Sequence, residues 1–275
     1  MAENSKIEWT KHSANAWWGC SKVHKGCDNC YAETLSKRWG FFVWGKTPRR
    51  EIKSFFTELA RFQKLAHEAG EQHTVFIGSM MDIFEKSSPL THTEGKEEAF
   101  KNTGSLRHKL FEKISNQEYP ALVFLFLTKR PSNINRFIPT PWLFQPPDNV
   151  MFGTSVSDQE TANRLIPQLL QVMGRKFISL EPMLAPVQLH QNWLAGDNIS
   201  DFMGTATNNI SWVICGGESG PHKRPFQADW ARQVRNDCDL AGVPFFMKQI
   251  DKKQPIPADL LIRQLPSFKI PAWQA

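Results

Sequence analysis

Short apolar runs recur along the chain, and longer segments between them carry apolar residues every three or four positions. Several runs are continuous rather than alternating, which is typical of strands covered on both faces, as in a parallel sheet. We therefore predict parallel strands at residues 16–19, 75–78, 121–127, 150–153, 177–180, 212–216 and 243–247.

Three of the intervening segments have the pattern of amphipathic helices, and each ends near a glycine, a common helix terminator. The segments are residues 51–70, 157–174 and 230–242. In the second, Ser157 and Glu160 form a capping-box pattern, and Pro167 is expected to kink or shorten the helix. Strands alternating with helices indicate an α/β fold. We predict a (β/α) barrel of parallel strands, partial rather than closed, with an open doubly wound sheet as the alternative.

Polar side chains directly follow six of the predicted strands. In such folds the carboxyl ends of parallel strands open onto the ligand site, so these groups are expected to meet in one place. They are Ser79 and Asp82; Thr128, Lys129 and Arg130; Thr154 and Ser155; Glu181; Glu218 and Ser219; Lys248 and Gln249. Glu181, which precedes a proline, and Glu218, within a glycine-rich run, are the hardest to explain as turn formers. We take both, with Lys248, as candidate catalytic residues.

The loop after the first predicted strand holds three of the five cysteines, Cys20, Cys27 and Cys30. A Cys-x-x-Cys turn brings two sulfurs to one metal or cluster edge, and three thiolates are one ligand short of a closed tetrahedral site. Gly19 and Gly26 each stand before a cysteine, where they allow close backbone approach and positive φ. The pattern predicts a metal centre with an open coordination position.

Disulfide bonds and a structural zinc site are the two alternatives for the cysteine loop. Disulfides are disfavoured because the cluster is odd in number and no secretory signal is seen. A structural zinc site with His24 or His12 as the fourth ligand stays an alternative to an iron-sulfur cluster, because thiolate and imidazole suit zinc equally well. Cys215, within a predicted strand, and Cys238, on an apolar helix face, are expected to be core residues.

The 275 residues are 41% hydrophobic and 22% charged, which suits one large domain with a substantial core. We expect that domain over residues 1–250, with an insertion near residues 188–210, and a C-terminal extension over residues 251–275. The N-terminus is charged where a signal peptide is apolar, so a cytoplasmic protein that does not associate with membranes is expected. The formal charge of +6 favours acidic partners such as nucleotides or nucleic acid.

The cysteine triplet after the first strand of an α/β barrel resembles that of the radical S-adenosylmethionine (radical SAM) superfamily, although the usual spacing there is three residues and then two. More closely, residues 7–10, 17–20 and 27–33 resemble a phage and prophage family called after its three-cysteine motif. Later segments also match that family, so the resemblance covers most of the chain. They are Asp82 with Phe84 and residues 127–130, 179–182, 216–220 and 245–249. The family is largely uncharacterised and is described as radical-enzyme-like.

The resemblance implies a mechanism class. Cys20, Cys27 and Cys30 would hold a 4Fe-4S cluster, and the amino and carboxylate groups of S-adenosylmethionine would chelate its fourth iron. One electron, supplied by a separate donor, would release a 5′-deoxyadenosyl radical that abstracts a substrate hydrogen. The cofactor carries this chemistry, and the protein orients it and excludes water.

Cofactor contacts follow from the resemblance by position. The end of the second strand, with Gly78, Ser79 and Asp82, would meet the methionine amino group, and Thr154 and Ser155 would meet the ribose. The superfamily's glycine-glycine-glutamate element occurs later here, as Gly216, Gly217 and Glu218, which leaves Glu218 to serve the substrate instead.

The substrate is not identified by the sequence. The basic charge and tryptophans near the cysteine loop, Trp9, Trp17 and Trp18, permit a nucleotide or nucleic acid whose bases stack on them. Lys129 and Arg130 could bind its carboxylate or phosphate. The alternative from a different class is a zinc-stabilised nucleic-acid-binding protein without radical chemistry.

Overall fold

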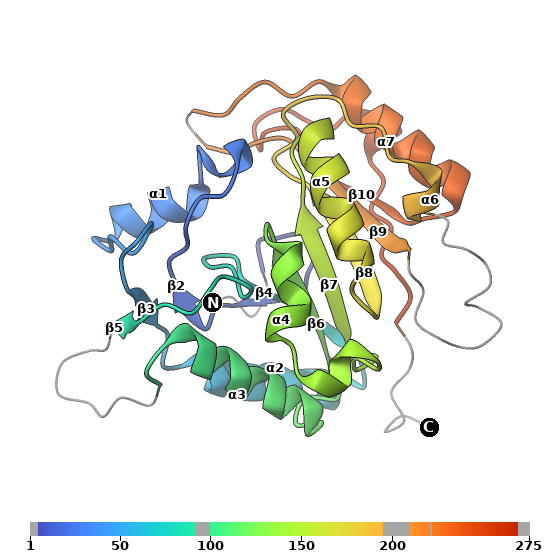
Figure 1. Cartoon of the computed structure of the whole chain (residues 1–275). Coiled ribbons are helices and arrows are strands. Elements are labelled where there is room, and N and C mark those ends of the chain that lie inside the picture. The colour runs from blue at the N-terminus through green and yellow to red at the C-terminus, as the bar shows by residue number, and fades with distance from the viewer. Residues whose placement is uncertain (1–4, 92–99, 195–208, 221, 269–275) are drawn as a thin grey trace.

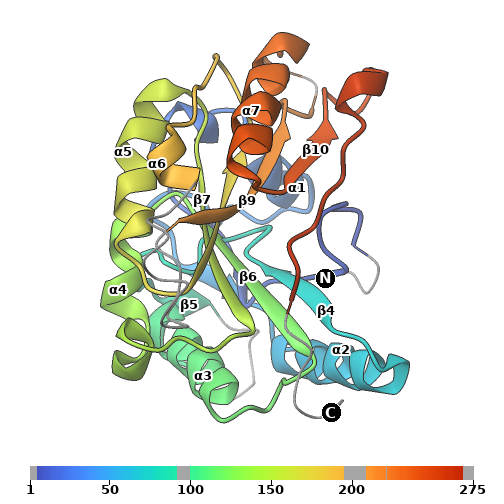
Figure 2. The ribbon, with the colours of Figure 1, turned by 90° about the vertical axis from the view of Figure 1, so that its right-hand side faces the viewer.

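A seven-stranded, all-parallel sheet organises the chain in the computed structural model, which describes residues 5–91, 100–194, 209–220 and 222–268. The sheet curls into a half-barrel, as Figures 1 and 2 show. The predicted partial barrel is thereby confirmed. In spatial order its strands are β1 (His12–Ala14), β4 (His73–Ile77), β6 (Leu122–Thr128), β7 (Val150–Ser155), β8 (Arg175–Leu180), β9 (Ile210–Gly216) and β10 (Phe245–Gln249).

The two faces of the sheet bury different apolar clusters. Along β6, Phe124 and Phe126 belong to the large cluster shared with the helices, whereas Val123 and Leu125 point the other way. This alternation is what successive strand residues require. The helices that cover the outer face are α2 (Phe55–Ala69), α3 (Thr103–Ser115), α4 (Ile134–Phe137), α5 (Gln159–Leu170), α6 (Gln191–Leu194) and α7 (Ala228–Ala241).

The inner face of the half-barrel is filled with aromatic rings. Trp9 packs on Phe76 and Trp212, with ring centroids 4.7 and 6.1 Å away. Phe177 and Phe246 are the other aromatic residues of this cluster. This face of the curled sheet is therefore a packed core, next to the pocket at the carboxyl ends of the strands.

The first predicted strand was misplaced. The sheet strand is β1, whereas Trp17–Trp18 form β2, which belongs to a separate small sheet with β3 (Arg49–Glu51) and β5 (Leu90–Thr91). Periodicity missed β1 because it begins with His12, a polar residue. The His12 ring is buried against the Phe62 ring, 4.2 Å away, and its Nε2 lies 3.0 Å from Nδ1 of His73.

All three predicted helices exist, with shifted ends. Gly70 and Gly242 terminate α2 and α7 in the left-handed conformation, as expected. Helix α5 is capped by Asp158 rather than Ser157, because Asp158 Oδ1 accepts from the Thr161 N–H at 2.8 Å. It continues through Pro167 and ends at Leu170. Helices α1 (Tyr31–Arg38) and α3 were not predicted.

The C-terminal extension is docked on the sheet over its described residues. The Met247 N–H donates to the Ile262 carbonyl at 2.8 Å, and the Gln264 N–H donates to the Phe245 carbonyl at 3.0 Å. The expected insertion near residues 188–210 contains α6, and its residues 195–208 lie outside the described ranges. No described helix combines the length and the apolar character that a membrane crossing requires.

Candidate functional site

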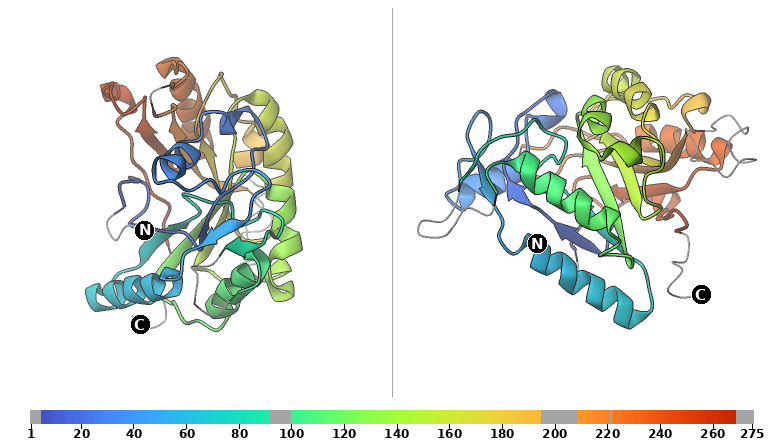
Figure 3. Two further views of the ribbon diagram at one scale, coloured as in Figure 1. Left: turned by 90° about the vertical axis from the view of Figure 1, so that its left-hand side faces the viewer. Right: turned by 60° about the horizontal axis from the view of Figure 1, so that its bottom comes forward.

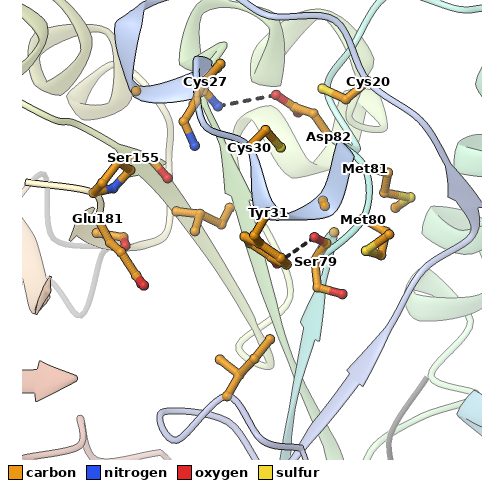
Figure 4. A pocket seen from close by; sticks show the side chains of 18 of the residues that line it. Cys20, Cys27, Cys30, Tyr31, Ser79, Met80, Met81, Asp82, Ser155 and Glu181 are labelled. Carbon is orange, nitrogen blue, oxygen red and sulfur yellow. Dashed lines mark hydrogen bonds between the residues drawn. The ribbon is translucent and has the colours of Figure 1, made fainter. Parts of the chain in front are cut away.

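A pocket of about 530 Å³ opens at the carboxyl ends of the parallel strands, and the three cysteines of the loop line it (Figure 4). The polar strand ends converge there as predicted. Lining residues from the predicted set are Cys20, Cys27, Cys30, Gly78, Ser79, Asp82, Ser155, Glu181, Gly217, Glu218 and Lys248. Segments separated by more than 200 residues of sequence thus contribute to one site.

Two predicted cofactor contacts lie outside the pocket lining. Thr154 is fully buried, and its hydroxyl donates to the Thr128 carbonyl at 3.0 Å. Gly216 is the last residue of β9 and packs beside Gln249 of β10. Both are structural residues of the sheet, which leaves their neighbours Ser155 and Gly217 as the groups that face the pocket.

Two glycines fix the course of the cysteine loop. Gly19 has φ +116°, and a Cβ there would lie 2.2 Å from the Val43 carbonyl oxygen. At Gly26 a Cβ would lie 2.2 Å from Oγ of Ser157, just after the end of β7. Gly19 therefore needs both the conformation and the close approach that only glycine allows, and Gly26 needs the close approach.

Arg130 connects Cys20 to the sheet. Its Nη1 donates to Asp82 Oδ2 at 2.7 Å and lies 3.7 Å from Cys20 Sγ, and its Nη2 donates to the Ser21 carbonyl at 2.6 Å. Asp82 also accepts from the Thr128 hydroxyl at 2.7 Å. The carboxylate is thus satisfied by the protein, so Asp82 positions Arg130 rather than offering a free ligand group.

A second buried ion pair lies behind this contact. Arg49 donates to both carboxylate oxygens of Glu85, at 2.9 and 3.0 Å. Burial, followed by the charges of Asp82 and Glu85, raises the pKa of the Cys20 thiol to about 12, against the lowering effect of Arg130. A bound metal cation would lower the pKa of this thiol again, because a thiol that coordinates a metal loses its proton.

Glu218 fastens the cysteine loop to the opposite side of the sheet. Its carboxylate accepts from Arg224 Nη2 at 2.6 Å, from Arg224 Nε at 3.0 Å and from Asn29 Nδ2 at 3.0 Å. Burial alone raises the pKa of Glu218, but the hydrogen bonds from Arg224 and Asn29 outweigh it and hold that pKa below its ordinary value. Because Asn29 lies between Cys27 and Cys30 in the sequence, its hydrogen bond to Glu218 helps to hold both cysteines in position.

Glu181 and Lys248, the other two candidate catalytic residues, form an ion pair on the pocket wall. They come from the ends of β8 and β10, and each side chain is largely but not fully buried. An ion pair exposed to a pocket can exchange its partner for a polar ligand. Glu181 and Lys248 thus present one carboxylate and one ammonium to the pocket.

Two pocket residues that sequence reasoning missed hold the second strand end. Asn15 donates from Nδ2 to Ser79 Oγ at 2.8 Å, and its Oδ1 accepts from the Met80 N–H at 2.7 Å. The Tyr31 hydroxyl donates to the Ser79 carbonyl at 2.6 Å, a contact drawn in Figure 4. Tyr31 could have been noticed because it directly follows Cys30; Asn15 carries no such signal.

The tryptophans near the cysteines divide into two kinds. Trp9 and Trp17 are buried core residues, with exposed fractions of 3% and 0%, and of these two only Trp9 reaches the pocket lining. Trp18 is partly exposed and lines the pocket. Cys215 and Cys238 are fully buried, as predicted for core residues.

The donor set fits a metal centre in its chemistry. All three loop cysteines are free thiols, each partly exposed and facing the same pocket. In the described residues, no three His, Cys, Asp or Glu side chains, the three cysteines included, lie close enough together to hold one metal ion. His12 is in the core, and the His24 ring accepts from the Gly26 N–H through Nδ1, so neither histidine lines the pocket.

Comparison with known proteins identifies the family of this chain but no activity. A family model described as "Protein of unknown function (DUF5131)" matches residues 4–259. No curated protein and no solved structure matches the chain. The chain therefore belongs to this family of proteins of unknown function, as expected for an uncharacterised family.

Proposed function

We propose that this protein is a radical SAM-type enzyme, in which Cys20, Cys27 and Cys30 hold a 4Fe-4S cluster and the adjoining pocket binds S-adenosylmethionine. The observation that carries the proposal is that three free thiols from one loop face one pocket, at the carboxyl ends of a curled parallel sheet. When bound, the cluster and S-adenosylmethionine supply one-electron reductive cleavage of a sulfonium, with the electron coming from a separate donor.

The chain contributes ligands and their orientation. Three thiolates leave one coordination position free, and the loop that carries them is fastened at both ends, by Arg130 near Cys20 and by Glu218 through Asn29. Arg130 also directs an N–H toward Cys20 Sγ. Hydrogen bonds to ligand sulfurs raise the reduction potential of such clusters, so Arg130 is in position to tune it.

Polar groups on the pocket wall would bind the rest of the ligand. Ser79 at the end of β4 and Ser155 at the end of β7 present hydroxyls, and Glu181 with Lys248 presents both charges. Because the amino and carboxylate groups of S-adenosylmethionine would be bound to the iron, Glu181 and Lys248 are left to hydrogen-bond its hydroxyls or polar groups of the substrate. Trp18 and Met81 contribute apolar wall to the pocket and restrict water.

The test is cleavage of S-adenosylmethionine by protein purified and reconstituted without oxygen. The wild-type protein is expected to form 5′-deoxyadenosine with a strong reductant, and replacing Cys20, Cys27 and Cys30 together by Ala is expected to abolish it. The matched control is Cys238→Ala, which alters a buried core cysteine outside the pocket. Formation of 5′-deoxyadenosine by the triple variant would show that the ligands are wrong, and a colourless zinc protein would favour a structural site.

A further inference from the structure

The positive charge of the chain is concentrated around the cysteine loop. Residues 20–53 contain eight Lys and Arg against three Asp and Glu, a net charge of +5 out of +6 for the whole sequence. One of the three acids, Glu33, is already paired with Lys22 and Lys37, at 3.3 and 2.6 Å. Arg49 is buried against Glu85 and Lys25 pairs with Asp158, both acids outside this segment, so an excess of +3 remains beside the pocket.

The same region carries exposed and partly exposed aromatic rings, which we call the aromatic rim: Trp18, Trp39, Phe41, Phe42 and Trp44. Trp39 is 61% exposed and Phe42 is 71% exposed. Helix α1, which ends just before Trp39, lies at the edge of the molecule beside the small sheet of β2, β3 and β5 (Figures 1 and 3). Large exposed rings gathered next to a pocket mark an interaction surface.

The rim is built so that two of its rings keep open faces. Trp18 packs against Trp39 and Phe41, with centroids 5.5 and 5.8 Å away. The guanidinium of Arg50 lies 3.8 Å from the Phe41 centroid. Trp18, Phe41 and Arg50 thus support one another from behind, while Trp39 and Phe42 remain exposed for a partner.

The rim is continuous with the pocket, and cations surround the opening. Trp18, Trp39 and Trp44 line the same pocket as the three cysteines. Each carboxylate that lines the pocket forms an ion pair within the protein: Asp82 with Arg130, Glu181 with Lys248 and Glu218 with Arg224. Among the lining lysines, Lys22 and Lys248 pair with Glu33 and Glu181, whereas Lys6, Lys129 and Lys252 have no carboxylate partner within 4.0 Å in the described residues. The unmatched charge at the mouth is positive.

We propose that the aromatic rim binds single-stranded nucleic acid, with bases stacked on Trp39 and Phe42 and phosphates paired with the surrounding lysines and arginines. Aromatic faces beside a cationic groove are what single strands require, since their unpaired bases expose π-faces that a duplex hides. That the bound strand is also the substrate rests on the proposed function; the binding itself does not.

The experiment measures fluorescence anisotropy of labelled 12-nucleotide single-stranded DNA and RNA with the full-length protein. Trp39→Ala combined with Phe42→Ala is expected to weaken binding of the preferred strand by at least about fivefold, the lower end of the range found for loss of a single stacked base. The matched control is Phe144→Ala combined with Leu240→Ala, since these side chains are exposed by 77% and 78% elsewhere. Inorganic polyphosphate, which has charge but no bases, is expected to compete weakly.

The outcomes separate this proposal from the proposed function. Binding that persists in the Cys20, Cys27 and Cys30 triple Ala variant supports the rim as an independent site, even if no S-adenosylmethionine is cleaved. The proposal is overturned if neither strand binds, if the rim variant binds as tightly as the control variant, or if polyphosphate competes as well as the oligonucleotide. Cleavage of S-adenosylmethionine without strand binding would leave only the proposed function standing.

Discussion

Replacing Arg130 by Met tests whether its buried contacts hold the cysteine loop to the sheet. The side chains of Arg130 and Asp82 are 13% and 7% exposed, and their closest atoms are 2.7 Å apart. At an effective dielectric constant of about 20, unit charges about 4 Å apart attract by about 4 kcal/mol. Removing one partner leaves the other buried charge uncompensated, which typically costs about 3 to 5 kcal/mol. We expect Arg130→Met to lower the free energy of unfolding by about that amount.

The assay is urea unfolding of metal-free protein, followed by tryptophan fluorescence and extrapolated linearly to water. Adding Asp82→Asn to Arg130→Met removes the orphaned charge. The double variant should therefore be more stable than the sum of the single effects predicts, by at least about 1.5 kcal/mol. Arg232→Met is the matched control, because Arg232 pairs with Asp229 and Asp259 on the surface, where a small change is expected. Additive effects, or an Arg130→Met loss no larger than the control, would refute the reasoning.

Three further predictions concern backbone conformation, pH and the second attachment of the cysteine loop. Gly19→Ala is expected to lower the free energy of unfolding in urea by at least about 2 kcal/mol more than Gly40→Ala. Both glycines have positive φ, but only at Gly19 would an added Cβ clash with neighbouring atoms. Equal losses would contradict this. Burial lowers the pKa of Lys176 to about 8 in the folded protein, whereas the unfolded chain keeps this proton up to about pH 10.4. The free energy of unfolding should therefore rise between about pH 8 and pH 10.4. Lys176→Met should lack this rise. Glu218→Ala should speed amide hydrogen exchange across residues 25–30 by about fivefold or more, while the amides of β7 exchange as before. Unchanged exchange in the loop would show that the hydrogen bond between Glu218 and Asn29 does not hold the loop in place.

Much of the fold could be predicted because the central strands are continuous apolar runs. The segments at residues 121–127 and 150–153 correspond to β6 and β7, and both are buried on both faces. Strand β1 was displaced because His12 is satisfied by His73 and by stacking on Phe62, contacts across about 50 residues or more that no local pattern reveals. Tertiary contacts of this kind override periodicity.

The site could be predicted in outline and not in its internal pairing. The rule that strand carboxyl ends converge correctly brought Ser79, Glu181 and Glu218 to one pocket. It could not distinguish groups that face a ligand from groups that hold others in position. Glu218, a candidate catalytic residue, accepts hydrogen bonds from Arg224 and Asn29, two partners that this rule does not predict. Which polar side chains pair with one another depends on the distances between them, and these distances are set only when the chain folds.

The most direct test of the proposed metal centre is iron, sulfide and zinc analysis of protein purified without oxygen. We predict about four irons and about four sulfides per chain, with a broad visible absorption that bleaches on reduction. Both should be lost when Cys20, Cys27 and Cys30 are replaced together by Ala. A colourless protein with about one zinc per chain and no iron would contradict the proposal.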